Sequence, residues 1–330
     1  MKKSPSVAVV GTGYWGKNLV RNFAALGALA AVVDADPVAL AAQAAAHPLI
    51  IATDDLDGLL ARADIDAVVI ATPANTHGRI AASCLAAGKH VFVEKPLCLD
   101  VEEARRLADD AKARGLTLMV GHVLLYHPAF VALRKAVAAG RIGRLRYVYS
   151  NRLSLGKVRT EENSLWSFAP HDISMILALT GRLPERVATH GGAYLSPDVA
   201  DSTISYLTFS EGVQAHIFVS WLHPYKDHRM IVIGSEGMIV FDDVAAGTAK
   251  LQIFRHVVSV DGPVPTVGKV PGEPLDYEAA EPLARECAHF LDCVANGTVP
   301  LSDGAEGIGV LRVLDACQRA LTAGVPQVLA

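Results

Sequence analysis

The chain has 330 residues and a formal net charge of −4, with 51% hydrophobic and 19% charged residues. Such a composition supports a large core and a two-domain protein, and the lack of any Lys/Arg run argues against a nucleic-acid-binding protein. No apolar stretch approaches the roughly 20 residues of a membrane helix, and the apolar run after the first lysines is too short for a signal peptide.

The five cysteines form no CxxC pair and the twelve histidines no HxxxH pattern. We therefore expect reduced thiols, a cytoplasmic location and no metal site.

Residues 1–121 alternate short apolar runs with Ala-rich stretches, a pattern that predicts repeated βαβ units around a parallel sheet. Strands are expected at 7–10, 29–33, 49–51, 67–70, 90–93 and 117–120, and helices at 15–26, 37–46, 76–87 and 101–114. Asp100 is expected to cap the last of these helices.

The rhythm changes after residue 121, where longer runs with apolar–polar alternation are separated by short turns. This pattern predicts an antiparallel sheet with one covered face. Strands are expected at 145–153, 201–209, 213–221, 229–234, 237–242 and 250–255, a loop at 258–276, and helices at 279–295 and 303–322. The predicted α/β fold is a doubly wound Rossmann domain, residues 1–121, followed by an α+β domain, residues 122–330, with an open, mostly antiparallel sheet.

A glycine hexad, GTGYWG at residues 11–16, directly follows the first predicted strand. In a dinucleotide-binding turn the first glycine permits the tight turn, the second lets a pyrophosphate approach the backbone, and the third lets helix and strand pack closely. The N-terminus of the following helix offers unpaired N–H groups to phosphates. The alternative is a glycine-rich turn without a ligand, but the strand–helix context favours a dinucleotide. The candidate cofactor contacts are Gly11, Gly13, Tyr14, Trp15 and Gly16.

Asp34 ends the second predicted strand, 21 residues after Gly13. An acid at about this spacing binds the ribose hydroxyls of a dinucleotide. Its carboxylate would repel the 2′-phosphate of NADP, and the next residues, Ala35 and Asp36, supply no arginine to bind that phosphate. The sequence therefore favours NAD over NADP as the cofactor.

Three further motifs follow predicted parallel strands: ATPANTH at 71–77, VEKP at 93–96, and Gly121-His122. Ligands of doubly wound proteins bind at this edge of the sheet. A lysine and a glutamate at a buried strand end are rare unless they are paired or functional. The alternatives are an ordinary βα loop, a Glu94–Lys95 surface pair and a domain linker. The further candidate cofactor contacts are Thr72, Pro73, Asn75, His77, Glu94, Lys95 and His122.

Together with FAPHDI at 168–173, these motifs resemble the glucose–fructose oxidoreductase/inositol 2-dehydrogenase (Gfo/Idh/MocA) family. The resemblance covers nearly the whole chain, including the closing segment 281–321. It implies an NAD(P)-dependent oxidoreductase that acts on an alcohol of a sugar or cyclitol. It also implies an open C-terminal sheet that builds a homodimer or homotetramer.

The resemblance places the family's catalytic lysine on Lys95 and its catalytic histidine on His171. Histidine suits the acid/base role because its usual pKa lies near neutral pH, and a lysine ammonium suits the stabilisation of a developing alkoxide. The reverse assignment stays open because burial can make a lysine a base. Many members carry an aspartate four residues before the histidine, where this chain has Ser167. Asp172 or another group of the second domain is expected to replace it.

The segment before His171 carries three cations within eight residues. Arginine and lysine both bind phosphate oxygens, and a tryptophan can stack on a sugar or base. The alternative is a solvated basic loop that faces Glu161 and Glu162. The candidate substrate contacts are Arg152, Lys157, Arg159, Trp166, His171 and Asp172.

Segments 151–174 and 219–224 resemble the nucleotide-sugar 3-dehydrogenases of the family. This implies oxidation of the C3 hydroxyl of UDP-N-acetylglucosamine, with a downstream aminotransferase as pathway partner in surface-glycan or lipid A biosynthesis. The alternatives are a dehydrogenase of UDP-N-acetylglucosaminuronate or of a free cyclitol or sugar. A non-catalytic NAD-bound sensor is the alternative from another class, and it is disfavoured because such members tend to lose the lysine.

Overall fold

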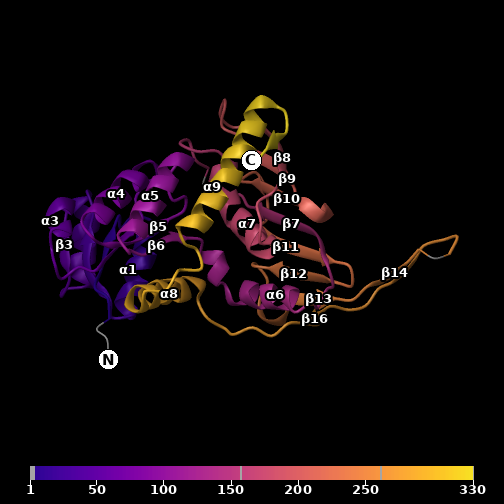
Figure 1. Cartoon of the computed structure of the whole chain (residues 1–330), viewed down its shortest axis with the longest axis horizontal. Helices are drawn as coiled ribbons and strands as arrows, with labels where there is room; N and C mark the ends of the chain where they lie inside the picture. The colour runs from indigo at the N-terminus through magenta and orange to yellow at the C-terminus, as the bar shows by residue number, and fades with distance from the viewer. Residues whose placement is uncertain (1–3, 157, 261, 330) are drawn as a thin grey trace. The chain divides into compact units, whose positions relative to one another are not determined.

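The computed structural model describes residues 4–156, 158–260 and 262–329. The chain divides into two compact units (Figure 1). Unit 1 comprises the residues up to Tyr126 together with Ala280–Leu311, and unit 2 comprises His127–Ala279 together with the residues from Arg312 onward.

This division differs from the predicted one because the chain returns to unit 1 late in the sequence. Helix α8 (Pro282–Asn296) and the first part of α9 (Gly304–Ala323) were expected in the second domain. The apolar face of α8 explains the difference. Phe290 is fully buried, and its ring centroid lies 6.4 Å from that of Phe23 and 5.5 Å from that of Phe92. Helix α8 therefore completes the core of unit 1.

Unit 1 is built on a six-stranded parallel sheet with the order β3-β2-β1-β4-β5-β6. The strand order reverses between β1 and β4, which creates the switch point where such sheets bind ligands. The predicted Rossmann fold is confirmed. The strands are β1 (Val7–Val10), β2 (Leu29–Val33), β3 (Ile51–Thr53), β4 (Ala67–Ile70), β5 (His90–Glu94) and β6 (Leu118–Gly121).

The four helices predicted for this part of the chain are present: α1 (Gly16–Ala25), α2 (Pro37–Ala46), α4 (His77–Ala86) and α5 (Val101–Ala113). As predicted, the Asp100 side chain caps α5 by accepting a hydrogen bond of 2.7 Å from the Glu103 N–H. Three short elements were not predicted: α3 (Leu56–Leu60), η1 (Ala74–Thr76) and η2 (Val123–Tyr126).

Unit 2 contains a nine-stranded sheet with the order β16-β13-β12-β11-β7-β10-β9-β8-β17. Every pairing is antiparallel except that of β7 with β10, so the predicted mostly antiparallel sheet is confirmed. The strands are β7 (Leu145–Leu153), β8 (Arg186–Gly192), β9 (Ser202–Thr208), β10 (Gln214–Ser220), β11 (Asp227–Gly234), β12 (Met238–Asp242), β13 (Leu251–Phe254), β16 (Glu273–Pro274) and β17 (Gln327–Val328).

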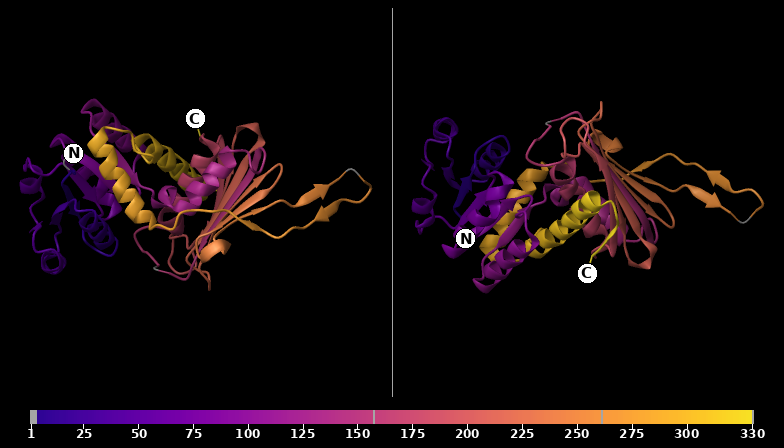
Figure 2. Two further views of the ribbon diagram at one scale, coloured as in Figure 1. Left: turned by 90° about the horizontal axis from the view of Figure 1, so that it is seen from below. Right: turned by 90° about the horizontal axis from the view of Figure 1, so that it is seen from above.

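Helices α6 (Pro128–Ala138) and α7 (Ser164–Thr180) lie on one face of this sheet (Figure 2). Neither helix was predicted. Pro170 lies inside α7, and an interior proline normally argues against a helix.

The segment 258–276 was predicted to be a loop, and this was wrong. Strand β14 (Val257–Ser259) pairs with β15 (Thr266–Gly268) in a separate two-stranded hairpin that projects from unit 2 (Figures 1 and 2). Pro263 and Pro265 lie between these two strands, where they mark the hairpin tip and not the absence of strands.

All five cysteines are buried thiols. No helix in the described part of the chain is long and apolar enough to cross a membrane. Residues 4–156, 158–260 and 262–329 also contain no cluster of His, Cys, Asp and Glu side chains suited to a metal ion.

Candidate active site

The glycine loop between β1 and α1 has the shape that a pyrophosphate requires. Gly11 has a φ of +87°, and a Cβ on Gly16 would collide with the Gly11 carbonyl oxygen. Both positions therefore need glycine. A Cβ on Gly13 would meet nothing within 4 Å, and α1 begins without a side-chain cap. An open glycine beside an uncapped helix N-terminus fits the phosphates of a dinucleotide.

Asp34 lies beside this loop at the end of β2. Its Oδ2 accepts hydrogen bonds from the Thr12 backbone N–H at 2.6 Å and from the Thr12 hydroxyl at 2.8 Å. Partial burial raises the pKa of Asp34, but these bonds and one from the Asp36 N–H outweigh burial and hold the pKa below its usual value. The carboxylate is thus ionised and oriented, which suits it to accept hydrogen bonds from ribose hydroxyls.

Trp15 links the glycine loop to the end of β5. Its indole N–H donates to Glu94 Oε1 at 2.5 Å, whereas the Tyr14 side chain is 84% exposed. Burial raises the pKa of Glu94 to about 7, against the opposing effects of the Trp15 hydrogen bond and the Lys95 charge. Lys95 follows at the strand end, half-buried, and its peptide bond to Pro96 is cis.

His77 joins the loop after β4 to the loop after β5. Its Nδ1 lies 2.7 Å from the Pro96 carbonyl oxygen, and its Nε2 lies 2.8 Å from the Thr72 carbonyl oxygen. Burial lowers the pKa of His77 more than these two carbonyls raise it, so a neutral ring donates to one of them at a time. The side chain is buried, which makes His77 a residue that positions both loops. Pro73 and Asn75 are exposed on the first of these loops.

His122 is buried just after β6, and its Nδ1 lies 2.5 Å from Glu306 Oε2 in the first turn of α9. Sequence patterns indicated His122 but not this partner, which lies 184 residues away along the chain.

In unit 2, His171 is half-buried on α7, directly after Pro170. The next residue, Asp172, is fully buried and faces strand β7. It accepts hydrogen bonds from Arg152 Nε at 2.8 Å, from Arg152 Nη2 at 3.2 Å and from the Ser150 hydroxyl. Asp172, which was expected to replace the aspartate that many family members carry at the position of Ser167, therefore hydrogen-bonds to strand β7.

Arg152 and Asp172 were predicted as substrate contacts, and this stays a prediction. The structure pairs the two side chains with each other, and they are 9% and 0% exposed. Arg152 Nη1 also lies 3.3 Å from His228 Nδ1. Burial and the Arg152 charge lower the pKa of His228 to about 4, so the ring is neutral and accepts this bond.

The other predicted substrate contacts lie before and on α7. Lys157 lies outside the described residues. Arg159 Nε forms an ion pair with Glu162 at 3.1 Å, as the solvated-loop alternative foresaw. The Trp166 indole N–H donates to Gln318 Oε1 at 3.1 Å.

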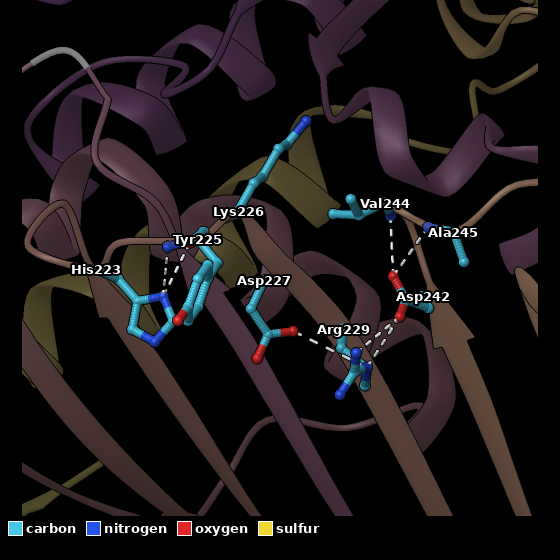
Figure 3. Close-up of a pocket in the computed structure, with 8 residues that line it drawn as sticks. All are labelled: His223, Tyr225, Lys226, Asp227, Arg229, Asp242, Val244 and Ala245. Carbon is cyan, nitrogen blue, oxygen red and sulfur yellow. Dashed lines mark hydrogen bonds and ion pairs between the residues drawn. The ribbon is translucent and has the colours of Figure 1, made fainter.

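A polar pocket of about 390 Å³ opens in unit 2 at the start of β11 and the end of β12 (Figure 3). Tyr225 and Lys226 are exposed there, and Arg229 is held by Asp242 at 2.8 Å. Of the residues that line the pocket, His223 lies in segment 219–224, which the sequence resemblance had indicated; the others belong to none of the motifs found in the sequence. Its lining residues are His223, Tyr225, Lys226, Asp227, Arg229, Asp242, Val244 and Ala245.

Sequence patterns also missed Glu286, a fully buried acid on α8. The helical spacing of the apolar residues around it could have identified it. Leu283, Cys287 and Phe290 mark the buried face of this helix, and position 286 falls within that face, where an acid is unusual.

Together, the parallel sheet, the glycine loop and the ionised acid after β2 define a dinucleotide-binding protein of the Rossmann type. Residues 6–122 match the model of the Gfo/Idh/MocA oxidoreductase family with an NAD-binding Rossmann fold, and residues 130–240 match the C-terminal domain of the same family. The chain belongs to the Gfo/Idh/MocA family, as the sequence motifs predicted. It is an NAD-dependent dehydrogenase, and its family acts on sugars and polyols.

Full-length relatives agree with this assignment. The chain is 33% identical to a UDP-N-acetylglucosamine 3-dehydrogenase of Acidithiobacillus ferrooxidans, over 92% of this chain and 93% of the relative. It is 29% identical to a scyllo-inositol 2-dehydrogenase (NAD(+)) of Bacillus subtilis, over 99% and 96%. A solved structure of the Acidithiobacillus ferrooxidans 3-dehydrogenase superposes with a TM-score of 0.85 at 30% identity, over 96% of this chain and 98% of that one.

The role of Asp34 can be tested by the Asp34→Ala variant. We expect NAD to bind about tenfold more weakly or worse, because charge-assisted bonds to the ribose are lost. The ratio of NADP affinity to NAD affinity should rise, because the repulsion of the 2′-phosphate is removed. Isothermal titration calorimetry measures both. Asp54→Ala, at an exposed position, is the control. Unchanged NAD affinity in Asp34→Ala would contradict the assignment.

The Arg152–Asp172 pair predicts a large stability effect. Arg152→Leu leaves a buried, uncompensated carboxylate, which should lower the free energy of unfolding by about 3–5 kcal/mol. The double variant Arg152→Leu/Asp172→Leu should recover much of this loss, because no charge is then left unpaired. Urea denaturation of both variants decides the matter. If the double variant is as unstable as the sum of the single variants, the two residues are not coupled.

Proposed function

We propose that the protein uses NAD to oxidise the C3 hydroxyl of UDP-N-acetylglucosamine to the 3-keto sugar. The main support is the similarity to a UDP-N-acetylglucosamine 3-dehydrogenase, which extends along nearly the whole chain in sequence and in fold. A 3-keto sugar is the kind of product that an aminotransferase consumes, so we place the reaction in surface-glycan or lipid A biosynthesis. Inositol dehydrogenases at 29–30% identity favour a second candidate, the oxidation of a free cyclitol.

In this proposal Lys95 and His171 divide two tasks at one hydroxyl group. Bound NAD supplies the acceptor for the hydride that leaves the carbinol carbon. One side chain takes the hydroxyl proton, and the other stabilises the negative charge that develops on the oxygen. Lys95 and His171 can exchange these two roles without changing the overall reaction. The proposal requires that Lys95 of unit 1 and His171 of unit 2 meet at the same hydroxyl group during turnover.

Two groups of unit 2 are candidates for the diphosphate of the substrate. The Arg159 guanidinium is part-exposed and has one carboxylate partner, Glu162. Lys226 and Tyr225 both line the pocket of Figure 3, where the lysine side chain points away from the tyrosine ring. The exposed Tyr225 ring suits stacking on a base, and an exposed ammonium suits a phosphate group.

The reaction can be followed through NADH absorbance with UDP-N-acetylglucosamine, scyllo-inositol and myo-inositol as parallel substrates. We expect turnover with the nucleotide sugar. The Lys95→Met variant should lose about 10²–10⁴-fold in kcat, because a proton-transfer or charge-stabilising group is removed. Lys112→Met, an exposed position on α5, is the control. Turnover of an inositol alone would favour the second candidate, and full activity in Lys95→Met would remove Lys95 from the mechanism.

Self-association through the sheet of unit 2 is also proposed. The face opposite α6 and α7 carries a ring cluster in which Tyr149 stacks on His216 with centroids 5.3 Å apart, and Tyr206 stays 47% exposed. Exposed apolar patches of this kind mark association surfaces. We expect a homodimer or homotetramer in sedimentation velocity, and dissociation in Tyr206→Glu. Tyr194→Glu, in the loop after β8, is the control. A monomeric wild-type protein would refute this assembly.

A further inference from the structure

Glu286 is a buried acid whose side chain makes no hydrogen bond to the described residues. The side chain is fully buried in the second turn of α8, and both carboxyl oxygens lack a hydrogen-bond partner there. Native proteins pair nearly all their buried polar groups, because an unpaired one destabilises the fold. The face of α8 that contains Glu286 is otherwise apolar, so packing alone would favour a leucine or methionine here. An acid kept in such a position indicates a function.

Titratable groups of β5, α9, η2 and α8 itself interact with Glu286. Burial raises the pKa of Glu286 well above its usual value, and the negative charges of Glu94 on β5 and Glu306 on α9 raise it further. Tyr126 of η2 and Cys287 of α8 lie close enough for the Glu286 charge to raise their own pKa values, after the larger effect of burial. Glu286 therefore keeps its proton at neutral pH.

The two acids that act on Glu286 lie in different surroundings. Glu94 is buried next to Lys95 and is held by the Trp15 indole. Glu306 is bonded to His122, and its side chain is 19% exposed.

Phe290 of α8 packs on Phe92 of β5 with ring centroids 5.5 Å apart, which brings α8 against the strand that ends in Glu94. Glu286 lies one turn before Phe290 and interacts electrostatically with both Glu94 and Glu306. It therefore links a group next to the predicted catalytic lysine with a group that reaches solvent.

We propose that Glu286 is a proton-transfer residue that connects Glu94 to Glu306, so that the proton released by alcohol oxidation leaves unit 1 through these three carboxyl groups. This rests on the proposed function, in which Lys95 lies at the reacting hydroxyl, and it gives Lys95 the hydroxyl proton. His171 then stabilises the oxygen.

The steps balance. Two electrons leave the substrate with the hydride, and one proton remains. The Lys95 ammonium first gives a proton to the Glu94 carboxylate, and the neutral amine then takes the proton of the hydroxyl group. Glu286 gives its proton to the Glu306 carboxylate and is reprotonated from Glu94, and Glu306 releases a proton to solvent. None of the described residues hydrogen-bonds to the Glu286 oxygens, so these transfers would need bridging water, which commonly connects buried polar groups.

Stability gives the first test. In Glu286→Met, the buried acid is replaced by an apolar side chain of similar size, so we expect a higher melting temperature than in the wild type. The pKa of Glu286 is higher in the folded than in the unfolded chain. Below the unfolded value both states hold the proton. As pH rises above that value, only the unfolded chain releases it, and the wild type loses stability. The advantage of Glu286→Met should therefore grow from pH 5 to pH 8. A variant less stable at both pH values would overturn the proposal.

Kinetics gives the second test, with whichever alcohol the wild type oxidises. Glu286→Gln keeps the shape of the side chain but cannot pass on a proton. We expect kcat to fall at least tenfold in Glu286→Gln and Glu286→Met, with little change in KM. In stopped flow with a pH-indicator dye, proton release should lag behind NADH formation. Asp292→Asn, on the exposed side of the same helix, should behave as the wild type. Wild-type kcat and synchronous proton release in both Glu286 variants would overturn the proposal.

An infrared measurement separates this inference from the proposed function. The carbonyl stretch of protonated Glu286 should be present in the wild type at pH 7 and lost in Glu286→Gln, whether or not any sugar is oxidised. Glu94, whose pKa is about 7, contributes a band of its own to both proteins, so the difference between the two spectra is the readout. If no tested alcohol is oxidised but the Glu286 band is found, the proposed function fails and the protonated state of Glu286 stands. If the band is missing, Glu286 does not hold the proton and the relay fails.

Discussion

The site in unit 1 depends on one constraint: a parallel sheet brings the carboxyl ends of all its strands to a single edge. The glycine loop, Asp34, Lys95 and His122 follow four different strands and meet there for that reason. These segments lie so close together that two positions among them must be glycine. A Cβ on Gly121 would approach the Glu94 carboxyl group to 2.9–3.1 Å, and a Cβ on Gly11 would press on the loop after β4 at 2.9 Å. Glycines at the ends of β1 and β6 thus allow the chain segments at this edge to approach one another closely.

Buried charge is concentrated at the candidate site residues of both units. In unit 2 the Arg152–Asp172 pair ties α7 to β7, and its desolvation is offset by several hydrogen bonds, including one from Ser150. His171 precedes Asp172 directly, so this anchor also sets the position of the histidine backbone. In unit 1 Glu94 has only part of such support, and Glu286 receives no hydrogen bond from the residues that the structure describes. By this difference we distinguish Asp172, a carboxylate that stabilises the structure, from Glu94 and Glu286, the carboxyl groups of the proposed proton relay.

Local motifs predicted the parts of the site that short segments determine. The glycine hexad with Asp34 predicted the cofactor, and VEKP with FAPHDI predicted the family. Partners distant in sequence could not be read in this way. Arg152 was interpreted as a phosphate ligand because its cationic neighbours are visible in the sequence, whereas the helix face that Asp172 presents to β7 is not. Pro170 concealed α7, and the return of α8 to unit 1 concealed the link between Glu286 and Glu94.

The late return of the chain to unit 1 has a consequence for biosynthesis. The aromatic surface of Phe23 and Phe92 is covered by Phe290, which leaves the ribosome long after them. Between Tyr126 and Ala280 lie roughly 150 residues, which take on the order of ten seconds to translate at about 5–20 residues per second. During that interval the nascent dinucleotide-binding half exposes an incomplete core. Chaperone occupancy of stalled nascent chains should accordingly be highest in this window and fall once α8 has emerged.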